Sequence, residues 1–461
     1  MTETSREGNN RLIVVLFGLM FVAVADNQMI SPLLPDLMAA FAMGAGQAGL
    51  LVSVYAIAAA VVSFAIGPLS DRTGRRKMLI AALIVFTAAT LLCGLAWDYA
   101  SLVAFRAVTG AAAGALSLNI TACIGDHYPY RRRGAAMGLV MSGYFAAMIL
   151  GVPAGAFVAE AWSWRWAFGA FAGAGLLLWA PALVFLPSRD PAANLGGTGG
   201  SASAAPAIQR VSISNLVRSY GRFLTRTGPL AVIAASFLVS ASTVGFITYV
   251  GTWLRDAYGL STDWIGMVFL FSGLGALLGS PLAGYLSDRA GKRGVVVVSG
   301  LVMAGLLAAI PWITGLLAVV FAGFILTGIA GAFRHAPLQA LVTAMASDEE
   351  RGTLIALKNT VAEFGIAGGT ALCGVLYVAF GYPSVGAACG VMAAAASVVI
   401  LIWVREPGGP GGPGEPDGPG TPDESGEPGD SDPPGEPGDS VPPGEPGEPD
   451  PPAGPAEPGQ T

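Results

Sequence analysis

Gly67-Pro-Leu-Ser-Asp71-Arg72-Thr-Gly74-Arg75-Arg76-Lys77 returns 217 positions later as Gly284-Tyr-Leu-Ser-Asp288-Arg289-Ala-Gly291-Lys292-Arg293-Gly294. Each copy lies between two long apolar runs. A second pair of landmarks, Arg133-Gly134 and Arg351-Gly352, repeats at an offset of 218 positions. Two landmarks at almost the same offset predict a duplicated helical unit whose second half runs in the same direction as the first.

The composition is that of a membrane protein. Apolar residues make up 53% of the chain, charged residues only 12%, and the mean hydropathy is +0.62, which is unlike a soluble domain. About 20 apolar residues cross the hydrocarbon core of a bilayer. Twelve such segments are expected, at 12–36, 47–68, 78–96, 100–124, 135–158, 166–186, 229–252, 264–286, 295–314, 316–344, 354–378 and 383–404. We therefore expect an all-α membrane protein with twelve transmembrane helices in two pseudo-symmetric six-helix bundles.

The expected organisation has five parts. They are a cytoplasmic N-terminus at 1–11, a bundle at 12–186, a linker at 187–228, a second bundle at 229–404 and a tail at 405–461. Within the linker, residues 211–226 fit either an interfacial amphipathic helix or a solvated connector. From Glu406 onward the tail carries 14 of the 30 acidic residues and no basic residue, and this Pro/Gly-rich composition predicts disorder. A solvated extension is the simpler reading, and a docking or regulatory tail is the alternative.

The distribution of Lys and Arg predicts the orientation. With the N-terminus in the cytoplasm, 19 basic residues lie on the cytoplasmic side, whereas Arg165 and Arg255 lie outside and Arg106, Arg334 and Lys358 fall within spans. The positive-inside rule then places both termini in the cytoplasm. The excess of Arg over Lys, 21 to 3, is typical of a high-GC bacterial genome and favours the inner membrane of a bacterium.

The N-terminus has a second interpretation. Residues 6–26 also fit a secretory signal peptide with basic, apolar and small-residue regions. Its removal would leave eleven spans and take the first helix from one copy of the duplication.

The repeated loop resembles the signature loop between the second and third helices of the major facilitator superfamily, G-x-L-x-D-R-x-G-R-[RK]. In that family the loop is a latch for the outward-facing state, and its partner is an acid at the inner end of the fourth span. A loop that only sets the orientation is the alternative. The resemblance assigns the latch to Gly67, Asp71, Arg72, Gly74, Arg75, Gly284, Asp288, Arg289 and Gly291, with Asp126 as the acid.

The fourth span carries a second resemblance to this family. Leu102-Val-Ala-Phe-Arg106-Ala-Val-Thr-Gly110-Ala-Ala-Ala-Gly114 is similar to L-x-x-x-R-x-x-Q-G-x-x-x-[GA], with Thr109 in place of Gln. The resemblance implies that Arg106 couples proton movement to transport. An arginine that extends to the membrane interface is the structural alternative.

The fifth span favours export. Gly143-Tyr144-Phe-Ala-Ala-Met-Ile-Leu-Gly151-Val-Pro153-Ala-Gly155 resembles the antiporter motif G-x-x-x-G-P-x-x-G of drug-efflux members, with Val152 inserted, as in the twelve-span drug- and sugar-efflux branch. Small residues permit close helix approach and proline bends the helix. Since Gly and Pro are frequent in membrane helices, uptake stays open as an alternative.

Ionisable residues within spans are candidates for function because they are costly in the bilayer. Asp26 in the first span and Glu363 in the eleventh are the expected proton carriers, with Arg334 as the counter-charge of Glu363. Asp26 would lie near the outer end if its span were shifted. A structural, hydrogen-bonded histidine is an equal alternative for His335. The expected substrate cavity is partly apolar and includes Asn27, Tyr55, Tyr144, Phe246, Tyr249, His335, Asn359 and Phe364.

The sequence argues against other classes of function. It has no phosphate-binding loop, no nucleophile pattern, no metal-ligand spacing of its four cysteines and no basic face for nucleic acid. We therefore predict no enzyme, cofactor or metal, but a monomeric secondary transporter in the lipid bilayer that exports a small organic compound, such as a drug, antibiotic or secondary metabolite, by proton antiport. The alternatives are a proton-coupled uptake permease and a non-transporting membrane sensor.

Overall fold

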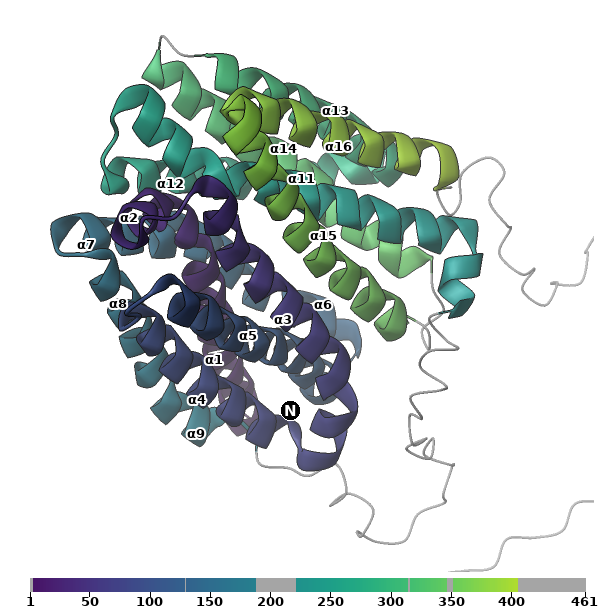
Figure 1. The fold of residues 1–461 in the computed structure, drawn as a ribbon. Helices are drawn as coiled ribbons and strands as arrows, with labels where there is room; N and C mark the ends of the chain where they lie inside the picture. Colours follow the sequence, from purple (N-terminus) through teal and green to yellow (C-terminus); the bar gives the residue numbers. More distant parts are fainter. Residues whose placement is uncertain (1–2, 129, 188–220, 314–315, 346–350, 405–461) are drawn as a thin grey trace, which may run out of the picture. The chain divides into compact units, whose positions relative to one another are not determined.

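The computed structural model describes residues 3–128, 130–187, 221–313, 316–345 and 351–404 (Figure 1). Within these ranges all the regular elements are helices, and twelve spans are long and apolar enough to cross a membrane. The predicted fold class is therefore confirmed. The tail at 405–461 and most of the linker, including most of the expected amphipathic helix, lie outside the described residues.

Several of the first six spans are interrupted, so that one span is divided into two shorter helices. Their elements are α1 (Glu3–Gln28), α2 (Ile30–Phe41), α3 (Ala45–Thr73), α4 (Arg75–Gly94), α5 (Tyr99–His127), α6 (Tyr130–Ala146), the π-helical turn η1 (Ala147–Gly151), α7 (Val152–Ala161), α8 (Trp164–Leu177) and α9 (Trp179–Phe185). We call this part the first half.

The last six spans, the second half, are more regular. Their elements are α11 (Thr227–Tyr258), α12 (Thr262–Ala290), α13 (Lys292–Ala309), the short 3₁₀ helix η3 (Ile310–Trp312), α14 (Leu317–Ala344), α15 (Arg351–Phe380) and α16 (Tyr382–Trp403).

Prolines explain the interruptions of the first half. Pro32, Pro153 and Pro181 follow the break between α1 and α2, the π-helical turn and the break between α8 and α9, respectively. Proline has no backbone N–H, so the carbonyl four residues earlier loses its helical partner and the helix bends or widens. The first span therefore breaks after Gln28, next to Asp26 and Asn27.

The duplication is also visible in the helix packing. A Cβ atom on Gly110 of α5 would lie 2.3 Å from the carbonyl oxygen of Tyr55 in α3, and one on Gly328 of α14 would lie 1.9 Å from the carbonyl oxygen of Ser272 in α12. The two glycines are 218 residues apart and the two carbonyls 217. The same backbone-to-backbone crossing is thus built at repeated positions, and only glycine fits there.

The two copies of the repeated loop have the same backbone conformation. Gly74 has a φ of 90° and Gly291 a φ of 86°, values that favour glycine. We call the end of the helices that carries these turns the loop side. The other end, with the turns near residues 42–44, 95–98 and 259–261, is the far side.

Polar groups of the two halves meet at the far side. Asp36 of α2 accepts hydrogen bonds from the Nη1 of Arg255 in α11 and, at 2.7 Å, from the Oγ1 of Thr262 in α12. The backbone N–H of Thr262 donates to the Oε2 of Glu160 in α7 at 2.9 Å. These four residues join the ends of four helices, two from each half.

Deeper in the helices, α3 and α15 lie side by side (Figure 1). Ser53 and Thr370 share a hydrogen bond of 2.6 Å between their hydroxyls. Nearer the far side, a Cβ on Gly49 would lie 1.9 Å from the Tyr249 hydroxyl and one on Gly251 would lie 2.3 Å from the carbonyl oxygen of Ser31. Glycines therefore allow the halves to approach closely in the far-side part of the spans.

Candidate functional site

A buried ion pair occupies the interior of the first half. The Nη1 of Arg106 in α5 lies 2.8 Å from the Oδ2 of Asp26 in α1, and both side chains are fully buried. The Nη2 of Arg106 donates to the Oδ1 of Asn27 at 3.2 Å, and the hydroxyl of Thr90 donates to Asp26 at 3.3 Å. The structure thus brings together three residues that the sequence analysis singled out, and it adds Thr90.

Tyr55 connects this ion pair to the second half. The guanidinium carbon of Arg106 lies 4.4 Å from the centroid of the Tyr55 ring, a distance typical of a cation–π contact. Tyr55 belongs to α3, which packs against α15, the helix that carries Glu363. Thr109 does not join the network, because its hydroxyl donates to the carbonyl of Phe105 in its own helix.

The glycines of the fifth span pack against the first. A Cβ on Gly151 would lie 2.6 Å from the Cβ of Ala25, next to Asp26, and one on Gly143 would lie 2.8 Å from the carbonyl oxygen of Phe17. Gly155 instead faces Phe171. The π-helical turn between Gly143 and Pro153 also faces the second half, where the space beside Gly273 is filled by Ile149. The sequence signal for this turn was Pro153, but its π-helical form was not predicted.

The second half contains the remaining buried charges. Arg334 of α14 and Lys358 of α15 are each only 7% exposed. The Nη2 of Arg334 donates to the Oγ1 of Thr243 in α11 at 2.9 Å, and the Nζ of Lys358 donates to the Oε1 of Gln339 at 2.7 Å. The expected ion pair between Arg334 and Glu363 is absent from these described side chains. That prediction is corrected, because Arg334 is held by a neutral hydroxyl instead.

The expected substrate residues divide into three groups. Asn27 and Tyr55 lie against Arg106, whereas Tyr144, His335, Asn359 and Phe364 are exposed. The predicted proton carrier Glu363 is half-buried. Phe246 and Tyr249 are buried. Tyr249 donates to the carbonyl of Thr370 at 3.0 Å, and the Phe246 ring lies 5.2 Å from that of Tyr382. We therefore reassign Phe246 and Tyr249 to helix packing.

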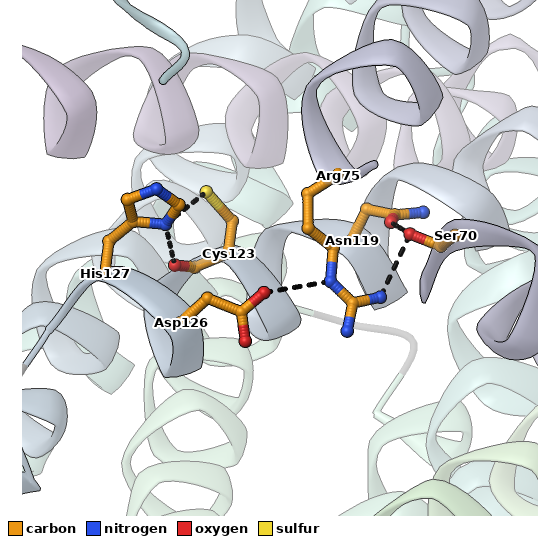
Figure 2. A network of polar contacts seen from close by, with 6 residues as sticks. All are labelled: Ser70, Arg75, Asn119, Cys123, Asp126 and His127. Carbon is orange, nitrogen blue, oxygen red and sulfur yellow. Dashed lines mark hydrogen bonds and ion pairs between the residues drawn. The ribbon is translucent and has the colours of Figure 1, made fainter. Parts of the chain in front are cut away.

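A polar network supports the first copy of the repeated loop (Figure 2). The Nε of Arg75 lies 3.1 Å from the Oδ2 of Asp126, and its Nη1 donates to the hydroxyl of Ser70 at 3.0 Å. Ser70 in turn donates to the side-chain oxygen of Asn119. The acid chosen by resemblance thus binds Arg75 within the same half. Asn119 was not predicted as a site residue. It lies on α5, four residues before Cys123, and no sequence motif marks it as part of a polar network.

The remaining loop residues are less constrained. The side chains of Asp71 and Arg72 and the surroundings of Gly67 lie outside what the structure describes. In the second copy, Asp288 and Arg289 are exposed, and the Arg289 guanidinium lies 4.3 Å from the ring centroid of Tyr285. A Cβ on Gly284 would meet nothing within 4 Å, so close packing does not explain this glycine.

The far-side residues Asp36, Glu160, Arg255 and Thr262 were not predicted as a site. Their sequence signal was weak, because charged residues at the ends of spans are common in membrane proteins. These four residues lie far apart in the sequence, and only the fold brings their helix ends into contact.

Comparison with known proteins identifies the family. The model of the Major Facilitator Superfamily matches residues 16–272 and 232–429. The uncharacterized MFS-type transporters YceJ and YwfA of Bacillus subtilis are 30% and 27% identical, over 79% and 80% of this chain and 89% and 86% of theirs.

Among solved structures, an inward-facing, unoccupied bacterial homolog of the human lysosomal transporter Spinster matches with a TM-score of 0.65 and 18% identity, covering 88% of this chain and 96% of its own. That likeness agrees with the twelve-span fold. The chain therefore belongs to the major facilitator superfamily and is a multi-pass membrane protein and secondary transporter, not an enzyme.

Proposed function

We propose that the protein exports a small organic compound, such as a drug, antibiotic or secondary metabolite, in exchange for protons. It would act in the inner membrane of a bacterium with the loop side in the cytoplasm. The count of basic residues supports this orientation, since 19 would lie on the cytoplasmic side and two on the other.

The contacts between the halves support alternating access. Asp36, Arg255 and Thr262 connect the halves at the far side, and Gly49 and Gly251 permit close packing nearby. In the proposed orientation this arrangement closes the outer face. Breaking these contacts and closing the loop side around the latch would present the same site to the outside.

Proton exchange is assigned to Glu363. This carboxyl group is half-buried in a span and forms no ion pair with the described side chains. A carboxylate in such a place is costly unless it is protonated or paired. Asp26 differs, because it forms an ion pair with Arg106 at 2.8 Å.

Tyr55 offers a route from proton binding to helix movement. Its ring lies against the Arg106 guanidinium, and its helix α3 packs against α15, which carries Glu363. A change in the charge of Glu363 therefore acts on the field around the Asp26–Arg106 pair. That pair lies beside the contact of Gly151 with Ala25, where the fifth span meets the first. The half-buried Glu363, which forms no ion pair with the described side chains, is the observation that carries the proposal.

The direction of transport is proposed from the fifth span. Gly143, Gly151 and Pro153 match the exporter-type pattern, and the glycines pack closely on α1. The test has two steps. A drug-hypersensitive bacterial host that expresses the protein is first screened against a compound panel to find a substrate.

That substrate is then loaded into proteoliposomes with an imposed pH gradient. We expect substrate efflux to be accompanied by proton influx in the wild type. Glu363→Gln should retain exchange of labelled for unlabelled substrate but lose acceleration by the gradient. Substrate movement in the same direction as the proton would instead identify an uptake permease.

A further inference from the structure

The second half holds two buried cations for which the described residues provide no counter-ion. Arg334 is 7% exposed and binds only the neutral hydroxyl of Thr243 through its Nη2, whereas its Nη1 has no hydrogen-bond partner. Lys358 is equally buried and binds only the neutral amide of Gln339. An unpaired charge at this depth costs several kcal/mol.

These two cations belong to one cluster. Lys358 of α15 contacts Gln339 of α14, which lies one helical turn after His335 and five residues after Arg334 on the same helix. His335 itself is exposed, so the cluster has an accessible edge. We call Arg334, His335 and Lys358 the cationic cluster.

The first half solves the same problem with a carboxylate. Asp26 neutralises Arg106, and the residue 217 positions after Asp26 is Thr243, which binds Arg334. The duplicated first helix thus presents an acid in one half and a hydroxyl in the other. The described residues therefore leave the cationic cluster without an ion-pair partner, so that an anion from outside the chain can take this place.

We propose that the cationic cluster binds the carboxylate or phosphate group of the transported compound, which makes the substrate an organic anion. Arg334 supplies the free Nη1 donor, and its planar guanidinium suits both groups. Lys358 supplies a second positive charge. This assignment rests on the proposed transport function and specifies its substrate class.

The phosphate of a lipid headgroup has the same chemistry as a substrate phosphate. The two sources differ in how they reach the cluster. A soluble anion acts in any bilayer, whereas a lipid acts only where anionic lipid is present. The experiment therefore varies the lipid and the soluble probe separately.

The test measures the melting temperature of the full chain in nanodiscs of phosphatidylcholine. The probes are benzoate, phenyl phosphate, the neutral benzamide and the cationic benzamidine. We expect at least one of the two anions to raise the melting temperature in a saturable manner, and benzamide and benzamidine to have no such effect.

Two variants locate the effect. Arg334→Gln and Lys358→Gln should each raise the half-saturating anion concentration at least about tenfold. Without a probe, Arg334→Gln should melt at or above the wild-type temperature, because it removes an unpaired buried charge. Arg165→Gln is the matched control: this arginine lies over the Trp164 ring, away from the cluster, and should leave the anion response unchanged.

Three results would overturn the proposal. The first is that neither anion stabilises the protein more than benzamide does. The second is an anion effect that persists in Arg334→Gln. The third is that phosphatidylglycerol raises the melting temperature in an Arg334-dependent manner and removes the effect of soluble anions, which would assign the cluster to lipid. Because the assay involves neither a pH gradient nor transport, its failure leaves the proton-coupled function standing.

Discussion

In the first half Arg106 faces the carboxylate of Asp26 at 2.8 Å, whereas in the second half Arg334 faces the hydroxyl of Thr243 at 2.9 Å. Asp26 and Thr243 occupy repeated positions, but the two arginines do not. The crossings at Gly110 and Gly328, in contrast, are the same in both halves. The duplication has thus kept the residues that determine backbone packing, while the charged residues have diverged. We associate the neutral pair with structure and coupling, and the unpaired cations with the ligand.

The largest effect is expected from breaking the neutral pair. Asp26→Asn leaves Arg106 buried beside a neutral amide and should lower the free energy of unfolding by about 3–5 kcal/mol, with loss of transport. Denaturation of the purified protein measures the stability. The control is the double variant Asp26→Asn/Arg106→Gln, which removes both charges and should regain much of the stability but no transport. Wild-type stability in the single variant would refute the importance of the pair.

The next largest effect on stability is expected at the two glycine crossings, which are the same in both halves. Gly110→Ala and Gly328→Ala place a methyl group 2.3 Å and 1.9 Å from a backbone carbonyl oxygen. Each should lower the free energy of unfolding by about 1–3 kcal/mol through overpacking. Gly125→Ala and Gly331→Ala, on the same two helices but without such close contacts, are the controls and should not destabilise. Unequal losses of unfolding free energy at the two crossings would mean that the two equivalent contacts do not contribute equally to stability.

A conformational effect is expected where the halves meet. Gly49→Ala would place a methyl group 1.9 Å from the Tyr249 hydroxyl, whereas the same change at Gly46 meets nothing within 4 Å. Gly49→Ala should therefore disfavour closure of the far side by about 1–3 kcal/mol, and Gly46→Ala should not. Hydrogen exchange of reconstituted protein should rise at the far-side ends of α3 and α11 in the first variant alone. Equal exchange in both would argue against a gate at this contact.

The smallest change in stability is expected at the loop side. The side chains of Arg75 and Asp126 are 21% and 44% exposed, and exposed ion pairs contribute about 0–1 kcal/mol. Arg75→Gln should thus melt close to the wild type but transport more slowly, because the loop conformation matters for switching. Asp126→Asn should behave alike, and the double variant should be no slower than either single one. If the double variant lost transport rate additively, Arg75 and Asp126 would act independently of each other.

Much of the fold was predictable from the sequence. The repeated loop and the apolar runs were sufficient for the twelve spans, because hydropathy and duplication act over long stretches of chain. The kinks of the first half required more detail. Pro32, Pro153 and Pro181 were visible, but whether a proline breaks a helix or widens it into a π-turn depends on the neighbouring helices.

The site was only partly predictable. The sequence drew attention to Asp26 and Arg106 because charge within a span is rare, and to Asn27 because it lies next to Asp26. Their pairing, and the pairing of Arg334 with Thr243 rather than Glu363, depends on helix rotation, which the sequence does not specify. Phe246 and Tyr249 illustrate the same limit, since an aromatic residue looks alike whether it packs between helices or faces a ligand.

We propose that the two halves have different roles: the proton is exchanged at Glu363 in the second half, and Asp26 in the first half stays paired with Arg106. Infrared difference spectroscopy of the reconstituted protein tests it without a substrate, by following the carbonyl stretch of a protonated carboxyl group across neutral pH. We predict that this band titrates in the wild type and in Asp26→Asn but disappears in Glu363→Gln. A band that persists in Glu363→Gln and is lost in Asp26→Asn would place the proton carrier in the first half and contradict the account.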